Sequence, residues 1–144
     1  WNLRNPKRDH MWIAAAGPAS NVILATVTIV LMHITLPLLR IAFEAGQAGA
    51  LETGQSAPAW PEMVWTILGY SVSINVILAT FNMIPIHPLD GSWILSRFLS
   101  GNMETAYATL RPYGFFILIF LMYTGVLWQF IDPVRLFAFT LLPS

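Results

Sequence analysis

The middle of the chain reads Phe81-Asn82-Met83-Ile84-Pro85-Ile86-His87-Pro88-Leu89-Asp90-Gly91, an acidic residue and two prolines directly after a long uncharged segment. Residues 63–84 carry no charge and are long enough to cross a bilayer as a helix, which takes about 20 residues. Pro85 and Pro88 end that helix, because proline lacks a backbone donor and restricts the residue before it. At membrane depth an irregular segment is stable only inside protein or beside a watery cavity, since lipid cannot satisfy its amides and carbonyls. We therefore expect Asp90 at the mouth of a helix bundle, facing inward.

The composition is typical of an integral membrane protein. Of the 144 residues, 56% are hydrophobic and 10% are charged, and the formal net charge is zero. The chain has no clustered Lys and Arg, which gives no support for nucleic-acid binding. Cysteine is absent, which excludes disulfides and thiolate metal ligands. The size allows one domain, and since the chain begins at Trp1 without a cationic leader, we expect it to be the downstream part of a longer protein.

Long uncharged segments predict an all-α fold, a polytopic transmembrane helix bundle with about three spans plus short interfacial helices. The candidate spans are residues 11–39, 63–84 and 113–131. The first exceeds one perpendicular crossing, so we expect it to tilt or to end in the interface. Pro18 lies inside this segment and should loosen or kink the helix there.

The connections between the spans are expected to be polar or interfacial. Residues 40–62 contain several Gly and Ala and two prolines, and they predict a surface loop with a short interfacial helix at its start. Short helices are expected at 92–99 and 103–110. Residues 134–142 are apolar but too short to cross, so they should lie in the interface or pack back on the bundle.

Positive charge assigns the two sides of the membrane. The N-terminal segment and the connection 86–112 share one side, which holds Arg4, Lys7, Arg8, Arg97 and Arg111. The other side holds only Arg40 and Arg135. Because cytoplasmic loops carry the excess of Lys and Arg, the Asp90 end is expected on the cytoplasmic side.

Polar side chains follow one face of the second span. Ser71, Asn75 and Asn82 recur at spacings of four and seven residues, which places them on one side of a helix. Such a face predicts an orientation toward the bundle interior rather than toward lipid. Asn75 is expected to bond across helices. His33, alone in the first apolar segment, is expected to be a hydrogen-bonded histidine of the bundle.

Asp90 has two explanations from the residues alone. Asp-Gly is a frequent turn pair, and an aspartate just before residues 92–99 can cap that helix. Alternatively, a carboxylate at a break between membrane helices can complete a zinc site whose other ligands come from another helix. His87 is expected to cap or to face water, with a place beside the metal as the alternative. The many Trp, Phe and Met residues are expected at the lipid surface and the interface.

Two motifs resemble those of one family. Residues 82–91 match Asn-x-x-Pro-x-x-Pro-Leu-Asp-Gly and resemble the signature of the site-2 protease family of intramembrane zinc metalloproteases. Residues 5–9 (Asn-Pro-Lys-Arg-Asp) followed by residues 16–21 (Ala-Gly-Pro-Ala-Ser-Asn) resemble the segment that opens the next-to-last core helix of the small bacterial members. The resemblance covers Leu3 to Leu95 in register.

The resemblance implies a zinc site and a reaction. In the family, zinc is held by two His of a His-Glu-x-x-His helix and by the Asp that matches Asp90, and the Glu of that helix is the general base for a zinc-bound water. The Asn that matches Asn82 would donate a hydrogen bond to the substrate. Pro85 and Pro88 would keep the loop irregular so that Asp90 turns toward the metal. The resemblance thus implies Zn2+ as cofactor, a transmembrane protein as substrate and the bacterial cell membrane as location.

The chain departs from the family because it contains no His-Glu-x-x-His. His10, His33 and His87 are scattered, and none is followed by Glu. Two zinc ligands and the general base are missing, so residues 1–144 cannot assemble the catalytic site alone. We expect the motif upstream of Trp1, which makes this chain the C-terminal part of a single metalloprotease domain. The alternative is a noncatalytic membrane helix bundle, either a transporter piece or a pseudoprotease that binds transmembrane helices.

Overall fold

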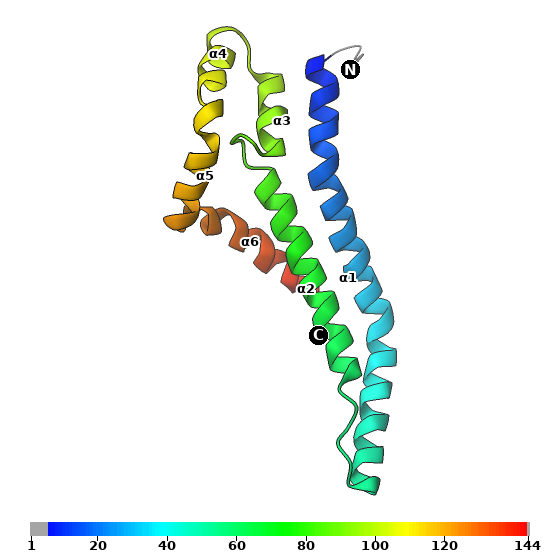
Figure 1. The fold of residues 1–144 in the computed structure, drawn as a ribbon. Coiled ribbons are helices and arrows are strands. Elements are labelled where there is room, and N and C mark those ends of the chain that lie inside the picture. Colours follow the sequence, from blue (N-terminus) through cyan, green and yellow to red (C-terminus); the bar gives the residue numbers. More distant parts are fainter. Residues whose placement is uncertain (1–5, 144) are drawn as a thin grey trace.

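The computed structural model describes residues 6–143, and all regular structure within them is helical, which confirms the predicted all-α class. Two long helices run side by side in opposite directions, and the short helices gather around one end of this pair (Figure 1). The elements are α1 (Pro6–Thr53), α2 (Trp60–Asn82), α3 (Asp90–Phe98), α4 (Gly101–Thr109), the 3-10 turn η1 (Arg111–Tyr113), α5 (Gly114–Tyr123) and α6 (Val126–Thr140).

Three helical segments are long and apolar enough to cross a membrane, as the sequence predicted. They are Arg8–Thr53, Trp60–Asn82 and Gly101–Tyr123, with mean hydropathies of 2.3, 1.6 and 1.3 over 18 residues. Large apolar side chains cover the outside of the helices; Ile23 of α1 and Ile67 of α2 are 61% and 63% exposed. In a bilayer this surface faces acyl chains, which are as apolar as the side chains themselves.

Helix α1 is longer than the sequence predicted. Residues 40–53 continue the helix, and only residues 54–59 form an irregular connection to α2. The prediction of a loop over 40–62 was wrong because the Ala, Leu and Glu of this segment are strong helix formers and outweigh its glycines. Gly54 follows the end of α1 with a φ of 67°, a conformation that glycine adopts without strain.

Two prolines lie inside α1, and the helix continues through both Pro18 and Pro37. Membrane helices tolerate proline where neighbouring groups satisfy the freed carbonyls. Pro18 leaves the Ala14 carbonyl, four residues earlier, without its helical donor. The nearby Ser20 hydroxyl donates to a different carbonyl, that of Gly17, at 2.7 Å. The loosening expected at Pro18 does not break the helix.

The third predicted span is broken. The sequence predicts one helix over 113–131, but α5 ends at Tyr123 and α6 begins at Val126. Between them Gly125 has a φ of 77°, which turns the chain, and α6 runs back to pack against α2 (Figure 1). Hydropathy does not reveal the break, because the residues on both sides of it are apolar. The structure places residues 134–142 largely in α6, where they pack back on the bundle as one of the two predicted alternatives.

The core lies where α1, α2 and α6 meet. Met32, Val72 and Ala138, one from each helix, are 0%, 1% and 8% exposed. Trp65 and Leu68 of α2 pack against them. This cluster joins the three helices and contains no residue of the 81–91 motif. The packing of α1 against α2 at this point therefore does not involve the motif.

The connection from α2 to α3 consists of tight turns. The Ile86 N–H donates to the Ile84 carbonyl at 2.8 Å, and the Leu89 N–H donates to the Ile86 carbonyl at 2.9 Å. These bonds satisfy backbone groups that have no helical partner beside two prolines. Gly91 follows in the first turn of α3, and a Cβ there would overlap the carbonyls of Met83 and Ile84. The start of α3 therefore lies directly against the end of α2.

Replacing Gly91 should test this close approach. Gly91→Ala should lower the free energy of unfolding by about 1–3 kcal/mol, because extra volume in a closed space forces the backbone to shift. Gly69→Ala is the matched control, since a Cβ there meets nothing within 4 Å and alanine favours the helix. Thermal unfolding of both variants in detergent micelles measures the difference. Equal stability of the two variants would contradict the contact.

Candidate functional site

Asp90 faces α1 and lies directly over Gly17. A Cβ built on Gly17 would lie 2.7 Å from Asp90 Oδ2, so a larger residue there would require the carboxylate to move. The Asp90 side chain is half-buried. The structure thus brings together the two motifs, whose residues Gly17 and Asp90 are 73 positions apart in the chain. The inward direction expected for Asp90 agrees with this contact.

Asp90 does not cap α3 with its side chain. The N-cap is Leu89, which makes no side-chain cap hydrogen bond, and Asp90 is the first residue of the helix. A negative charge in the first turn interacts favourably with the positive end of the helix dipole. The charge of Asp90 therefore stabilises the start of α3. Its carboxylate makes no cap hydrogen bond and lies toward α1.

Asn82 is the last residue of α2 and is half-buried. It shares a face of this helix with Ser71 and Asn75, which are also half-buried. The Asn75 side chain donates a hydrogen bond to the Ser71 carbonyl at 2.8 Å, so the bond across helices predicted for Asn75 is wrong. Because α3 begins against the end of α2, Asn82 and Asp90 lie at the two ends of one compact connection.

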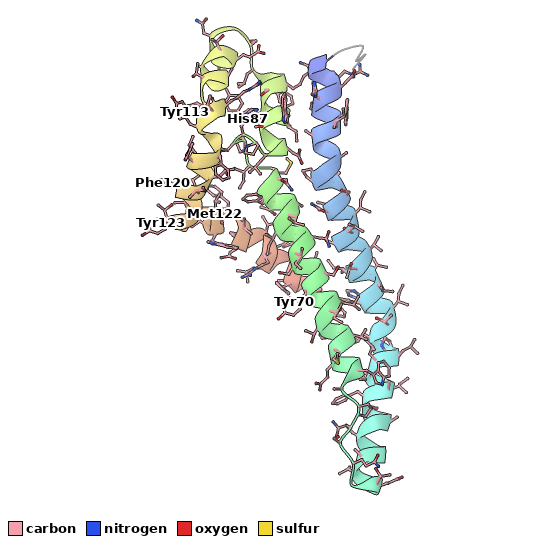
Figure 2. All side chains as sticks on the ribbon, viewed as in Figure 1. Tyr70, His87, Tyr113, Phe120, Met122 and Tyr123 are labelled. Carbon is pink, nitrogen blue, oxygen red and sulfur yellow. The ribbon has the colours of Figure 1, made fainter. Side chains whose placement is uncertain are left out.

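A second set of contacts holds the connection from the side of α4 and α5. The Tyr107 hydroxyl donates a hydrogen bond to the Pro85 carbonyl at 2.8 Å. Gly114, at the start of α5, packs against the His87 carbonyl so closely that a Cβ would overlap it. Figure 2 shows His87 between α3 and the α4–α5 segment. The proline-containing turns are therefore enclosed by protein on this side.

Aromatic rings surround His87. Its ring centroid lies 5.5 Å from that of Trp93, edge to face, and 5.7 Å from that of Tyr107. Its Nε2 is buried and has no hydrogen-bond partner within residues 6–143. Burial lowers the pKa of His87, and the positive charge of Arg111 lowers it further. His87 is half-buried, and its Nε2 is turned away from water, contrary to the expectation that this ring faces water.

Trp93 joins several of these groups. The His10 ring of α1 stacks on it with centroids 5.2 Å apart and an interplanar angle of 24°. The Arg111 guanidinium carbon lies 5.1 Å from the centroid of the Trp93 ring. Sequence reasoning missed this cluster, since Trp93 was grouped with the lipid-facing aromatics. One signal was present: Trp93 follows Asp90 by three residues and so shares its side of α3.

The remaining histidine lies elsewhere. His33 is exposed on α1, and its Nδ1 lies 2.9 Å from the Ile29 carbonyl of the same helix. The predicted hydrogen bond is present, but it is made within α1. His33 therefore has no part in the site around Asp90.

Comparison with known proteins identifies the family. The sequence pattern of peptidase family M50 matches residues 2–123. The chain belongs to this family. M50 is the site-2 protease family, so the resemblance found in the two motifs is confirmed.

A relative of the chain comes from Bacillus subtilis (strain 168). The chain is 27% identical over 142 residues to the protein described as putative zinc metalloprotease YwhC, and the match covers 92% of this chain. The chain spans 56% of the length of that relative. No solved structure matches the chain. Its family membership thus identifies the chain as part of a metallopeptidase family.

Residues 6–143 do not form a complete metal site of the kind that the M50 family implies. Among them no group of three His, Cys, Asp or Glu side chains is placed to hold a metal ion. Catalytic zinc takes three protein ligands and an open position for water or substrate. The Asp90 carboxylate is therefore not part of such a three-residue group within residues 6–143.

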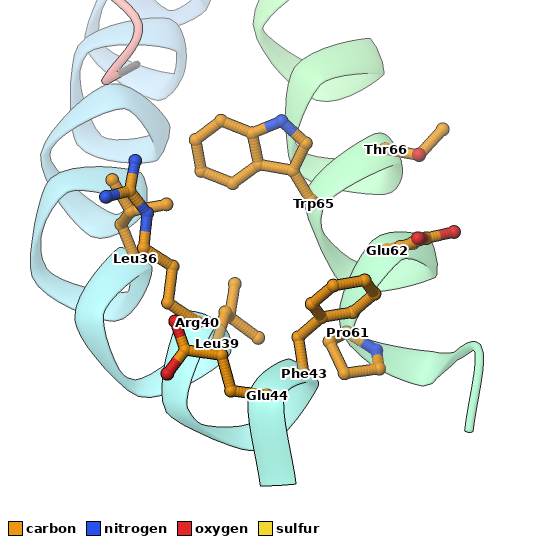
Figure 3. A pocket seen from close by; sticks show the side chains of 9 residues that line it. All are labelled: Leu36, Leu39, Arg40, Phe43, Glu44, Pro61, Glu62, Trp65 and Thr66. Atoms are coloured by element: carbon orange, nitrogen blue, oxygen red, sulfur yellow. The ribbon is translucent and has the colours of Figure 1, made fainter. Parts of the chain in front are cut away.

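Asp90 lines neither of two larger hollows beside the helices, nor a small one of about 40 Å³ next to His87 and Tyr107. An apolar cavity of about 460 Å³ lies between the α2–α3 connection and the α5–α6 pair. A cleft of about 400 Å³ lies between α1 and α2 near the end of α1, where Trp65 and Phe43 line it together with charged side chains (Figure 3). The charged side chains are those of Arg40, Glu44 and Glu62.

His87 should make stability depend on pH. Its pKa in the fold is below the ordinary value of 6.5, so the unfolded chain binds more protons as the pH falls. Stability should be full above about pH 6.5 and should fall as the pH drops toward the lowered pKa. His87→Phe, which keeps a ring, should remove this component, whereas His33→Gln, at an exposed histidine, should not. Denaturation in detergent between pH 7.5 and 5 measures it, and an unchanged slope in His87→Phe would contradict the assignment.

Proposed function

We propose that the intact protein containing this chain is an intramembrane zinc metalloprotease that hydrolyses peptide bonds in or near transmembrane segments of substrate proteins. The observation that carries the proposal is the contact of the Asp90 carboxylate with Gly17. It joins the Pro-Leu-Asp-Gly motif to the Ala-Gly-Pro-Ala motif of α1 at half-buried positions. Membership of family M50 and the likeness to a putative zinc metalloprotease support it.

In this proposal Asp90 is a metal ligand and Asn82 contacts the substrate. An ionised carboxylate offers two oxygens, and those of Asp90 point away from the α3 cap toward α1. The Asn82 amide can donate to a substrate carbonyl from the end of α2. When bound, zinc lowers the pKa of its water to about 7 and polarises a carbonyl. Two further ligands and the general base would come from a His-Glu-x-x-His segment outside residues 1–144.

The protein would be integral to the bilayer, with the Asp90 end on the cytoplasmic side. Arg8 lies near the start of α1, Arg97 lies in the last turn of α3, and Arg111 precedes α5. Arg40 lies in the distal part of α1. This excess of positive charge supports the proposed side through the preference of Lys and Arg for cytoplasmic loops. The substrate would reach the site from within the membrane.

Asp90→Asn in the intact protein should lower both zinc affinity and proteolysis by about 100-fold or more, since even outer-shell partners of metals contribute about 10–100-fold. Membrane insertion should not change. Asp132→Asn is the matched control, because Asp132 pairs with Arg135 at 3.1 Å on α6 and lies outside the motif. Zinc content and cleavage of a model transmembrane substrate provide the two measurements. Normal activity of Asp90→Asn would reject the ligand role; helix binding without zinc or cleavage in the unmodified protein would favour a noncatalytic bundle.

Asn82→Ala should separate turnover from metal content. A donor to the developing oxyanion contributes about 100-fold to 1,000-fold in kcat, whereas zinc content should stay near that of the unmodified protein. Asn75→Ala is the control, since the Asn75 amide bonds within α2. Single-turnover cleavage beside a zinc assay measures both quantities. Loss of zinc in parallel with activity would place Asn82 with the metal instead of the substrate.

A further inference from the structure

We infer that Trp93 is a positioning residue that holds the Asp90 carboxylate against α1. This inference rests on the proposed function, because it matters for catalysis only if Asp90 binds the metal. Trp93 itself contacts no reacting group in this account. It acts by fixing the helix that carries Asp90.

The contacts of α3 with α1 define two points of attachment. Asp90 lies over Gly17, and one turn later Trp93 stacks on His10. His10 and Gly17 are seven residues apart, which is about two turns of α1 and returns to the same face. Because the two helices run in opposite directions, one rigid face of α3 meets one face of α1 at both points (Figure 1).

Trp93 also ties α3 to the segments on its other side. The His87 ring meets the Trp93 ring edge to face at 5.5 Å, and the Arg111 guanidinium carbon lies 5.1 Å from its centroid. These partners belong to the α2–α3 connection and to η1. One indole therefore joins α1, the connection and η1 at the helix that begins with Asp90.

Removing the Trp93 indole would leave only one of the two contacts between α3 and α1, that of Asp90 with Gly17. Asp90 would keep its contact at Gly17, but α3 could rotate or move away, since a helix of this length has little stability of its own. A metal ligand must be held within about 0.5 Å of its productive position. A displacement of about 1 Å at a catalytic group can cost about 100-fold in rate. Trp93 therefore affects the reaction through the geometry of Asp90.

Cross-linking measures this geometry without any activity. Gly17→Cys with Asp90→Cys places two thiols at a contact that the structure shows, and residues 1–144 contain no other cysteine. The pair is built into the intact protein, with any upstream cysteine replaced by Ser. Adding Trp93→Ala should lower the yield of the disulfide at least fivefold, and adding Trp93→Phe, which keeps a stacking ring, should restore most of it.

Kinetics with Asp90 intact then test the consequence for the reaction. Trp93→Ala should lower kcat about tenfold or more with KM within twofold, and Trp93→Phe should recover most of kcat. Trp12→Ala is the matched control, because Trp12 lies two residues from His10 and is 63% exposed. It should change neither the cross-link nor kcat.

Three results would overturn the inference. They are an unchanged cross-link in Trp93→Ala, a weakened cross-link with normal kcat, or an equal loss in Trp12→Ala, which would indicate anchoring at the interface. The failure of the proposed function is separate from these. An active Asp90→Asn protein would reject that function, whereas an inactive one with an unchanged Trp93→Ala cross-link would reject the role of Trp93 alone.

Discussion

The start of α3, which carries Asp90, packs closely against α1 at Gly17 and against the end of α2 through Gly91. At Gly17 a methyl group would lie 2.7 Å from the carboxylate oxygen of Asp90, and at Gly91 it would overlap backbone carbonyls at the end of α2. These two glycines let the first turn of α3 approach α1 and α2 at once. The Asp90 carboxylate thus lies half-buried between α3 and α1, in a molecule that exposes many large apolar side chains.

Irregular backbone in a membrane protein has to be enclosed by protein, and the arrangement of the short helices serves this end. The Tyr107 hydroxyl bonds the Pro85 carbonyl, and Gly114 closes on the carbonyl of His87. The third candidate span, Gly101–Tyr123, thus also encloses the turns that carry the motif. The turn at Gly125 then returns α6 to α2, which completes the packing with few buried residues.

Patterns within single segments were enough to predict the helical class, the number of candidate spans and the break that precedes Asp90. Hydropathy and the positions of prolines are local properties, so a single sequence is enough to read them. The extent of α1 over residues 40–53 was missed because helix preference there outweighs a polar, glycine-containing composition. The break at Gly125 was missed because a left-handed glycine leaves hydropathy unchanged. The cluster around Trp93 could not be predicted, because only packing brings together its partners His10, His87 and Arg111.

The unexpected extension of α1 changes how the molecule occupies its surroundings. A helix of 48 residues is about 72 Å long, whereas the hydrocarbon core of a bilayer is about 30 Å thick. Even a tilt of about 40° leaves part of such a rod in water. The distal part carries Arg40, Glu44 and Glu52, which makes it the part that protrudes. One continuous helix therefore carries the Asp90 contact in its first part and a charged segment, suited to water, in its last part.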